Sequence, residues 1–441
     1  ADGEDSVTPN ANLNMIGQCV LTEGLTYAER LKSEPPDTKV TQAIKRIPGI
    51  ALPDPKHLLD GEPIPMHIME FAAHLYQHHQ TPENCSFYIP KIETEEEATY
   101  LKTMIETCEK MIKEVNPSYK IGTVKVIIVF ETARATFRMK EIAYNLSPYF
   151  AGGSLGWHDY LASAATLFEG VEGYEIPSKS YPYIVRNYIL TSHRLLAREM
   201  HSIGALAIGG MYGFLPIKSE KPEESKLSYD ITMHNYVKDV IAQLHRGLDG
   251  FWVAHPQFVR LGIGFVEAFH IDKEKNQLGE DGSLLFELID STFKGNDYSQ
   301  RELKSFIQTV DQTTEPLDPS SKEYHLAVLA ANLKTSDVIA NNDPREIRYN
   351  ITQTIEYLLA WFQGTGCVAL PTTLSGAYGE QVPVRVMDDL ATTERSLREV
   401  WAEVNHGRFS LNKIRDILKE VSIDITQQHM IETIEKYHDV D

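Results

Sequence analysis

The sequence predicts an α/β fold in which eight parallel strands close into a (β/α)8 TIM barrel, followed by a C-terminal α-helical domain. Short apolar runs alternate with longer stretches of helical periodicity, which is typical of parallel sheets. The chain has 441 residues, which leaves room for a barrel of about 250 residues with insertions. Eight such apolar runs can be distinguished, and eight strands are what a barrel of this kind needs.

The predicted strands lie near residues 1–5, 42–47, 86–91, 124–131, 149–155, 204–209, 250–255 and 366–370. Helical patterns occupy residues 65–80, 94–115, 182–202, 230–247 and 346–364. The helix at 94–115 starts with Thr-Glu-Glu-Glu, and acidic residues stabilise a helix N-terminus. We expect a polar loop at 215–228 and additional helices beside the barrel within 257–345.

The C-terminal part follows the eighth predicted strand. A loop containing Gly and Pro is expected at 371–386, and helical patterns occupy 389–404 and 410–437. We therefore predict a barrel over residues 1–372 and a C-terminal helical cap over residues 373–441.

The net charge of −20 makes nucleic acid and anionic membranes unlikely partners, because such a surface repels phosphate groups. An anionic substrate remains possible, since a bound divalent cation can invert the local field. The four cysteines lie far apart and form no CxxC pair, which argues against a zinc knuckle or a redox motif.

No transmembrane segment or signal peptide is recognised, and the last four residues are not a peroxisomal Ser-Lys-Leu signal. We expect a cytoplasmic protein, with a peroxisomal or glyoxysomal location possible in a eukaryote. The chain starts with Ala1 in a segment typical of the middle of a fold, so we expect further residues upstream.

Acidic residues at the ends of predicted strands are the main chemical signal. Glu131 ends the fourth apolar run, Asp159 follows the fifth, and Glu4 and Asp5 end the first. The carboxyl ends of barrel strands converge on the active site, and several buried carboxylates together favour an oxygen-ligand cation such as Mg²⁺. Each acid alone could equally cap a helix or join a salt bridge.

Arg46 ends the second predicted strand, just before Pro48 and Gly49. An arginine at this position can neutralise negative charge that develops on a substrate oxygen. A structural ion pair is the alternative.

Eight segments, in order along nearly the whole chain, resemble the malate synthase family, and more closely its shorter A-type form. They are ADGEDS (1–6), YIPKIE (88–93), FETARATFRMKEI (130–142), GSLGWHDY (153–160), HSIGALAIGGM (201–211), DGFWVAHP (249–256), YLLAWFQGTGCVALP (357–371) and MDDLATTE (387–394). The resemblance implies a Mg²⁺-dependent condensation of acetyl-CoA with glyoxylate, followed by thioester hydrolysis to malate and CoA in the glyoxylate cycle.

The same resemblance implies a role for individual residues. Glu131 and Asp159 match the metal ligands, Arg46 the arginine that stabilises the enolate, and Asp389 the general base. The remaining matches are to substrate-binding positions: Glu4, Asp5, Gly156, His158, Pro216 and Cys367.

The chain departs from the family pattern at three places. Residues 46–50 are Arg-Ile-Pro-Gly-Ile where the family often has Arg-Pro-Arg-Gly-Trp, the base motif has Met-Asp-Asp for Met-Glu-Asp, and 371–386 is longer than expected. Two alternatives stay open: a C–C lyase acting on malyl-CoA or citramalyl-CoA on the same barrel, and a non-catalytic descendant that binds or scaffolds.

A pair of histidines needs a separate interpretation. His74 and His78 have the four-residue spacing of a zinc pair on a helix, but no HExxH glutamate accompanies them. We expect them to be surface residues of an amphipathic helix.

Overall fold

The structure, a computed structural model, describes residues 2–7, 16–25, 42–172, 174, 176, 188–294, 296, 299–308, 316–330, 341–376 and 379–438. Parts of the predicted elements at 182–202 and 257–345 lie outside the described residues.

A curled parallel sheet forms the centre of the molecule, with strand order β1-β4-β5-β6-β7-β9. Its strands are β1 (Ile44–Arg46), β4 (Ser86–Ile89), β5 (Lys125–Phe130), β6 (Phe150–Leu155), β7 (Leu206–Tyr212) and β9 (Gly250–Val253). Six of the eight predicted strands are therefore confirmed as neighbours in one parallel sheet. The carboxyl ends of all six lie at the same edge, because the pairing is parallel throughout.

The first predicted strand is reduced to one parallel bridge between Asp2 and Arg46. Gly366 packs against the backbone of Ser6 and Val7 so closely that a Cβ at this position would overlap them. The segment 2–7 thus lies between β1 and the start of the eighth predicted strand, which is the neighbourhood that a barrel requires.

Helices alternate with the strands, and most of them pack on the outer face of the sheet. They are α2 (Met66–His78), α3 (Glu95–Val115), α4 (Ala133–Phe137), α5 (Met139–Leu146), α6 (Trp157–Leu167), α7 (Leu190–His201), α8 (Pro222–His245) and α9 (Pro256–Glu274), with a 3-10 turn at Pro82–Asn84. The predicted start of α3 is confirmed. Thr94 accepts the N–H of Glu97, and Glu97 accepts the N–H of Thr94, which together form a capping box.

Alternation along the strands separates two apolar layers. Phe87 in β4 and Val126 and Ile128 in β5 face the helices and join the large core with α2, α3 and α5. Tyr88 and Ile127 point the other way, into a smaller cluster on the inner face. Both strands are buried on both faces, which explains their continuous apolar runs.

A second sheet corrects the prediction for the end of the barrel. Residues 366–370 were expected as an eighth parallel strand and 371–386 as a loop. Instead, β10 (Val368–Ser375) and β11 (Gln381–Asp388) form an antiparallel ribbon, and β8 (Phe214–Pro216) pairs with β11. Val382 and Val384 alternate with exposed residues and pack on Ile231 of α8. This period of two is a strand signal.

Two further differences concern local elements. The polar loop predicted at 215–228 extends too far along the chain, because α8 already starts at Pro222. A proline fits the first turn of a helix. A hairpin of β2 (Pro53–Leu59) and β3 (Glu62–Pro65) was not predicted. The extra helices expected near 257–345 include α10 (Leu284–Thr292), α11 (Gln300–Gln308) and α12 (Lys322–Val328).

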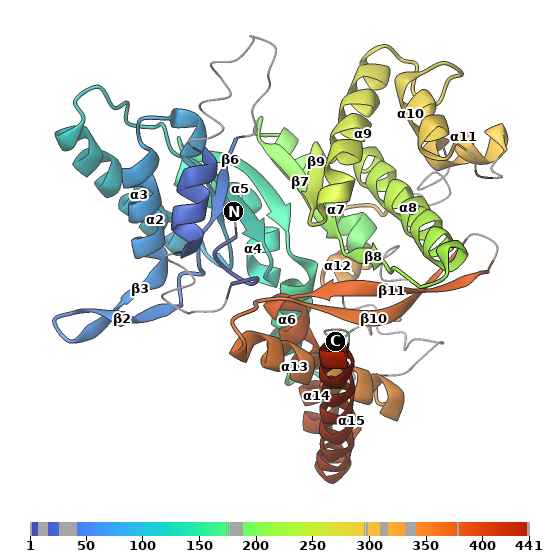
Figure 1. Cartoon of the computed structure of the whole chain (residues 1–441). Coiled ribbons are helices and arrows are strands. Elements are labelled where there is room, and N and C mark those ends of the chain that lie inside the picture. Colours follow the sequence, from blue (N-terminus) through green and yellow to red (C-terminus); the bar gives the residue numbers. More distant parts are fainter. Residues whose placement is uncertain are drawn as a thin grey trace.

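The C-terminal helices gather on the far side of the β10–β11 ribbon from the parallel sheet (Figure 1). They are α13 (Pro344–Phe362), α14 (Leu390–Asn405) and α15 (Leu411–His438). Ile347 and Ile351 of α13 share a core with Val421 and Ile425 of α15. The division of the chain at residue 372 stays a prediction.

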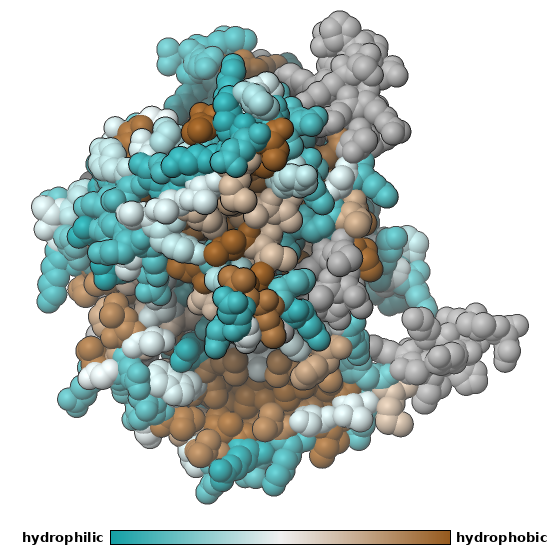
Figure 2. Space-filling model, turned by 90° about the vertical axis from the view of Figure 1, so that its left-hand side faces the viewer, coloured by the Kyte–Doolittle hydropathy of each residue, from teal (hydrophilic) through white to brown (hydrophobic). Residues whose placement is uncertain are grey.

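The surface combines charged and apolar areas. Figure 2 shows an apolar area low on the left-hand face, at the height of the C-terminal helices in Figure 1. The exposed large apolar side chains of these helices include Leu358, Phe362 and Leu397. Within the described residues, no helix is long and apolar enough to span a membrane.

The expectation for His74 and His78 is wrong, because both side chains are buried in the core between α2 and the sheet. His74 Nε2 donates to the carbonyl oxygen of Asn84 over 2.9 Å, and its ring packs edge-on against Phe87. Burial lowers the pKa of His74 to about 4, since a charged imidazole is disfavoured away from water. The histidine is thus a neutral structural residue.

We predict that His74 makes the fold sensitive to acid. Because its folded pKa lies below the unfolded value of about 6.5, the unfolded state binds more protons below pH 6.5, so stability falls as the pH falls toward 4. Between pH 6.5 and 5, protonation of this residue in the unfolded state should lower the free energy of unfolding by about 2 kcal/mol. Urea unfolding of the wild type and of His74→Gln, which keeps a donor, should show a smaller pH dependence in the variant. Equal pH dependence would contradict the assignment.

Candidate active site

Four acidic side chains from three segments meet at the carboxyl edge of the sheet. Glu131 directly follows β5, Asp159 is the third residue of α6 after β6, and Glu4 and Asp5 lie in the turn after the Asp2 bridge. All four side chains are buried. These acids therefore lie together at one edge of the sheet, as we expected from the sequence.

Lys91 lies at the centre of this acidic group. Its Nζ is 2.6 Å from Glu4 Oε1, 3.1 Å from Asp5 Oδ1 and 3.4 Å from Asp159 Oδ1. Its backbone N–H donates to Glu131 Oε1 over 2.6 Å. Lys91 has a φ of 55°, a conformation that costs energy for a residue with a side chain and is retained where the surroundings impose it. One residue thereby contacts all four acids.

Arg46, at the end of β1, forms the second cationic centre. Its Nε and Nη2 donate to the two carboxylate oxygens of Asp2 over 2.6 and 2.5 Å. Its Nη1 lies 3.3 Å from Glu4 and 3.4 Å from Asp5. The guanidinium also lies 5.5 Å from the ring centre of Trp252. Arg46 therefore takes part in a structural ion-pair network, which was the alternative to a catalytic role. It also lies beside the predicted site.

The N-terminus of α6 faces the same edge. Gly156 caps this helix, and a Cβ at Gly156 would collide with the Glu131 carboxylate. The first amides of a helix have no partner within the helix and attract anions. Gly156 therefore allows the Glu131 carboxylate to pack directly against the N-terminus of α6.

Asp389 enters from the C-terminal part of the chain as the N-cap of α14. Its Oδ1 accepts the N–H and the hydroxyl of Thr392, over 3.3 and 3.0 Å. The N–H of the next residue, Leu390, donates to the carbonyl of Asp5 over 3.5 Å. Burial raises the pKa of Asp389, as does the charge of Asp5, while Arg46 lowers it. Asp389 therefore shares an electrostatic environment with the acidic group.

The proposed metal ligands have strongly perturbed acidities. Burial raises the pKa of Glu131 well above its usual value, and the charge of Asp159 adds to this effect. Burial, followed by the charge of Asp5, raises the pKa of Asp159 to about 6, although Lys91 and a hydrogen bond with Glu131 act in the opposite direction. Burial and Asp5 likewise raise the pKa of Glu4 to about 9. The site has more buried negative charge than its own cations neutralise.

This donor set suits a divalent cation, because hard oxygen ligands are what Mg²⁺ and Ca²⁺ prefer. Within the described residues, however, no three acidic, histidine or cysteine side chains are arranged as a complete set of ligands. The Lys91 ammonium takes a position among three of the carboxyls, as a cation would.

The remaining predicted residues lie at different distances from this group. Cys367 lies just before β10, and burial raises the pKa of its thiol, with smaller contributions from Asp389 and Asp2. His158 follows Trp157 in the first turn of α6. Pro216 pairs with Val384 in the ribbon, about 13 Å along the strand from Asp388. The structure brings Cys367 and His158 near the acids, and Pro216 only to the adjoining ribbon.

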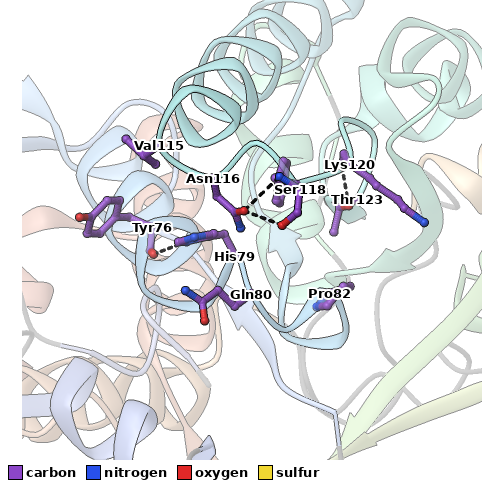
Figure 3. A pocket seen from close by; sticks show the side chains of 10 residues that line it. Tyr76, His79, Gln80, Pro82, Val115, Asn116, Ser118, Lys120 and Thr123 are labelled. Atoms are coloured by element: carbon purple, nitrogen blue, oxygen red, sulfur yellow. Dashed lines mark hydrogen bonds between the residues drawn. The ribbon is translucent and has the colours of Figure 1, made fainter.

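A separate cavity of about 700 Å³ lies elsewhere (Figure 3). Its lining comes from residues 76–82 and 115–123, which precede β4 and β5. It therefore opens at the amino ends of these strands, opposite the acidic group.

Sequence reasoning missed Lys91 and Asp2, the two residues that organise the charges. Lys91 stands in the segment YIPKIE, two residues after β4. A lysine at a strand end is a weak signal by itself, because most lysines are solvated. Only its left-handed backbone and three carboxyl neighbours distinguish it.

A curled parallel sheet with buried acids, a lysine and an arginine at the carboxyl ends of its strands defines a barrel protein with an active site of the TIM-barrel type. Comparison with known proteins identifies the family. Residues 42–288 match the family model "Malate synthase, TIM barrel domain", and residues 341–439 match "Malate synthase, C-terminal". The chain belongs to the malate synthase family, and the predicted TIM-barrel fold class is confirmed.

Individual relatives are distant. The chain is 24% identical to glyoxysomal malate synthase of Gossypium hirsutum and 26% identical to malate synthase A of Escherichia coli, over 92% of this chain in both cases. It spans 63% and 66% of the length of these two proteins. A solved ternary complex of Haloferax volcanii malate synthase with pyruvate and acetyl-CoA is similar at 13% identity and a TM-score of 0.45, covering 90% of this chain and 84% of that one.

We predict that Lys91→Met destabilises the protein and that Mg²⁺ restores part of the loss. Removal of the ammonium leaves Glu4, Asp5 and Asp159 without their shared cation. Breaking a buried pair costs ~3–5 kcal/mol. Because the Lys91 side chain is 31% exposed, we expect roughly 2–4 kcal/mol. Urea unfolding with and without Mg²⁺ measures both effects.

The matched control is Lys45→Met, which removes a buried lysine of β1 that lies 2.9 Å from Glu70 of α2. This variant should lose stability without recovery in Mg²⁺. Equal recovery of both variants, or none for Lys91→Met, would show that Lys91 does not substitute for a divalent ion.

Proposed function

We propose that this protein is a malate synthase, which condenses acetyl-CoA with glyoxylate and hydrolyses the resulting thioester to malate and CoA. The observation that carries the proposal is the meeting of Glu131, Asp159 and Arg46 with Asp389, which comes from the C-terminal part of the chain. Family membership supports the reaction, and the names of the relatives support the substrates.

Glu131 and Asp159 are the proposed ligands of a divalent cation, which we take to be Mg²⁺. When bound, the cation would supply Lewis-acid polarisation of the glyoxylate aldehyde. The first amides of α6, from Trp157 to Asp159, would hold the glyoxylate carboxylate. Glu4 and Asp5 would line the same space from the side of the first segment.

Asp389 is the proposed general base. Its two hydrogen bonds with Thr392 both use Oδ1, so we assign Oδ2 as the atom that removes a proton from the acetyl methyl group. Arg46 would stabilise the negative charge that forms on the thioester oxygen. The methyl carbon then bonds to the aldehyde carbon and forms malyl-CoA. Addition of water to the thioester and loss of the CoA thiolate give malate.

The burial of Asp389 suits this role. A carboxylate whose pKa is raised is a stronger base than one in water, and a catalytic base works best when its pKa is near the working pH. Asp5 and burial both raise the pKa of Asp389, while Arg46 limits the rise. Cys367 at the start of β10 and Pro216 at the end of β8 would contact the acyl-CoA along the ribbon.

We predict that Asp389→Asn loses at least a hundredfold in kcat, because the amide cannot accept the methyl proton. Its Mg²⁺-dependent binding of glyoxylate should remain within twofold of the wild type. CoA release with a thiol reagent and calorimetric titration with glyoxylate provide the two measurements.

Glu394→Gln, an exposed change on the same helix, serves as the control and should leave turnover intact. Substantial turnover in Asp389→Asn would exclude this residue as the base.

A folded wild-type protein without turnover would reject malate synthase activity. Cleavage of malyl-CoA to glyoxylate, in place of hydrolysis to malate, would favour the lyase alternative. Absence of Mg²⁺-dependent glyoxylate binding and of CoA binding would favour a non-catalytic role.

We predict that Mg²⁺ affinity falls as the pH falls through about 6. Protons compete with the metal for Asp159, whose pKa is about 6, and for Glu131, whose pKa is raised further by burial and by Asp159. Each proton that the metal must displace changes the affinity up to about tenfold per pH unit. Calorimetric titration between pH 8 and 5.5 measures this slope. Glu131→Gln should bind Mg²⁺ weakly and with a smaller slope, and a pH-independent affinity in the wild type would contradict the proposal.

A further inference from the structure

Arg395 in α14 is fully buried, although it is a long and permanently charged side chain. Its Nε donates to Glu399 Oε1 over 2.7 Å, one turn further along the same helix. Its guanidinium lies 4.7 Å from the ring centre of Trp157, and its Nη1 lies 3.4 Å from His158 Nδ1. The charged group of α14 therefore reaches across to the first turn of α6.

The two helices that Arg395 joins hold the two most important acids of the site. Asp389 caps α14 six residues before Arg395, which is about 9 Å along the helix axis. Trp157 and His158 immediately precede Asp159 in α6. The contact partners of Arg395 are thus the chain neighbours of the proposed metal ligand, while its own helix starts at the proposed base.

Asp389 and Asp159 need such a link because they repel each other. The N–H of Leu390, next to Asp389, donates to the carbonyl oxygen of Asp5 over 3.5 Å. Lys91 Nζ in turn contacts both Asp5 and Asp159, so the two acids belong to one group of like charges. Apolar packing between helices tolerates sliding. A planar guanidinium stacked on an indole and bonded to a carboxylate has strict geometry.

A buried polar network connects this part of α14 to α13. Glu399 is buried, and its Oε2 accepts Asn350 Nδ2 of α13 over 2.9 Å. The hydroxyl of Ser396 donates to Gln353, also in α13, and both residues are buried. Arg395 is therefore the centre of a polar contact among α6, α13 and α14, which lie together in Figure 1.

We propose that Arg395 is a positioning residue, which fixes α14 against the first turn of α6 and thereby sets the distance between Asp389 and Asp159. The inference rests on the proposed function for the roles of these two acids. Arg395 acts through Trp157 and His158 and does not itself take part in the reaction.

The test uses the double variant Arg395→Met/Glu399→Gln in the full chain. Removal of Arg395 alone would leave Glu399 buried without its cation, whereas a buried ion pair replaced by neutral groups often retains stability. We expect a folded protein whose kcat is at least tenfold lower, with the KM of both substrates and the Mg²⁺ affinity within twofold of the wild type. The single variant Arg395→Lys should recover only part of kcat, because it restores charge but not the planar group.

Arg398→Met is the control. Arg398 lies on the same helix, is 38% exposed and stacks on Trp401 at 5.8 Å, so its loss should leave kcat unchanged. A folded double variant with kcat within twofold of the wild type would overturn the inference, because a role in stability alone does not lower turnover once the protein is folded.

Hydrogen exchange supplies a readout that does not depend on turnover. Amides in residues 157–163 and 389–396 should exchange at least tenfold faster in the double variant, and amides of α3 should not change. Absence of turnover in the wild type would reject the proposed function but not this inference. Unchanged exchange in both segments would reject the inference, whatever the activity.

Discussion

The contact of Lys91 with the buried carboxyl groups is the interaction on which the site depends. Parallel strands bring their carboxyl ends to one edge, and here those ends supply acids that would repel one another. Lys91 and Arg46 offset part of this repulsion. The remaining excess of negative charge is visible in the raised pKa of Glu131 and of Asp159. An arrangement of this kind is ready to accept a divalent cation.

The second constraint is the division of the site between two parts of the chain. The acids, Lys91 and Arg46 belong to segments at the edge of the sheet, whereas Asp389 caps a helix beyond the β10–β11 ribbon. The ribbon delivers Asp389 to the acidic group, because Asp388 pairs with Val368 beside the start of β10. The ribbon that replaces the predicted loop is thus the element that carries Asp389, the proposed base, to the acidic group.

The histidines and the buried arginine illustrate how burial changes the meaning of a residue. His74 has the spacing of a metal ligand but is a neutral core residue bonded to Asn84. Arg395 lies on a helix with exposed charged residues but is buried against Trp157. In each case the sequence pattern is the same for a solvated residue and for a buried one. The packing partners, which come from distant parts of the chain, decide between the two.

The sequence by itself determined the alternation of strands and helices, the acids at the strand ends and the family resemblance, because these depend on local periodicity and on residues close in the chain. Glu131, Asp159 and Arg46 were found in this way. Tertiary structure alone decided that Lys91 joins four acids, that Val368–Ser375 and Gln381–Asp388 form a ribbon and that Arg395 reaches α6. The physical reason is that antiparallel pairing and buried ion pairs draw on partners far away in the chain, and a one-dimensional pattern does not record which partners meet.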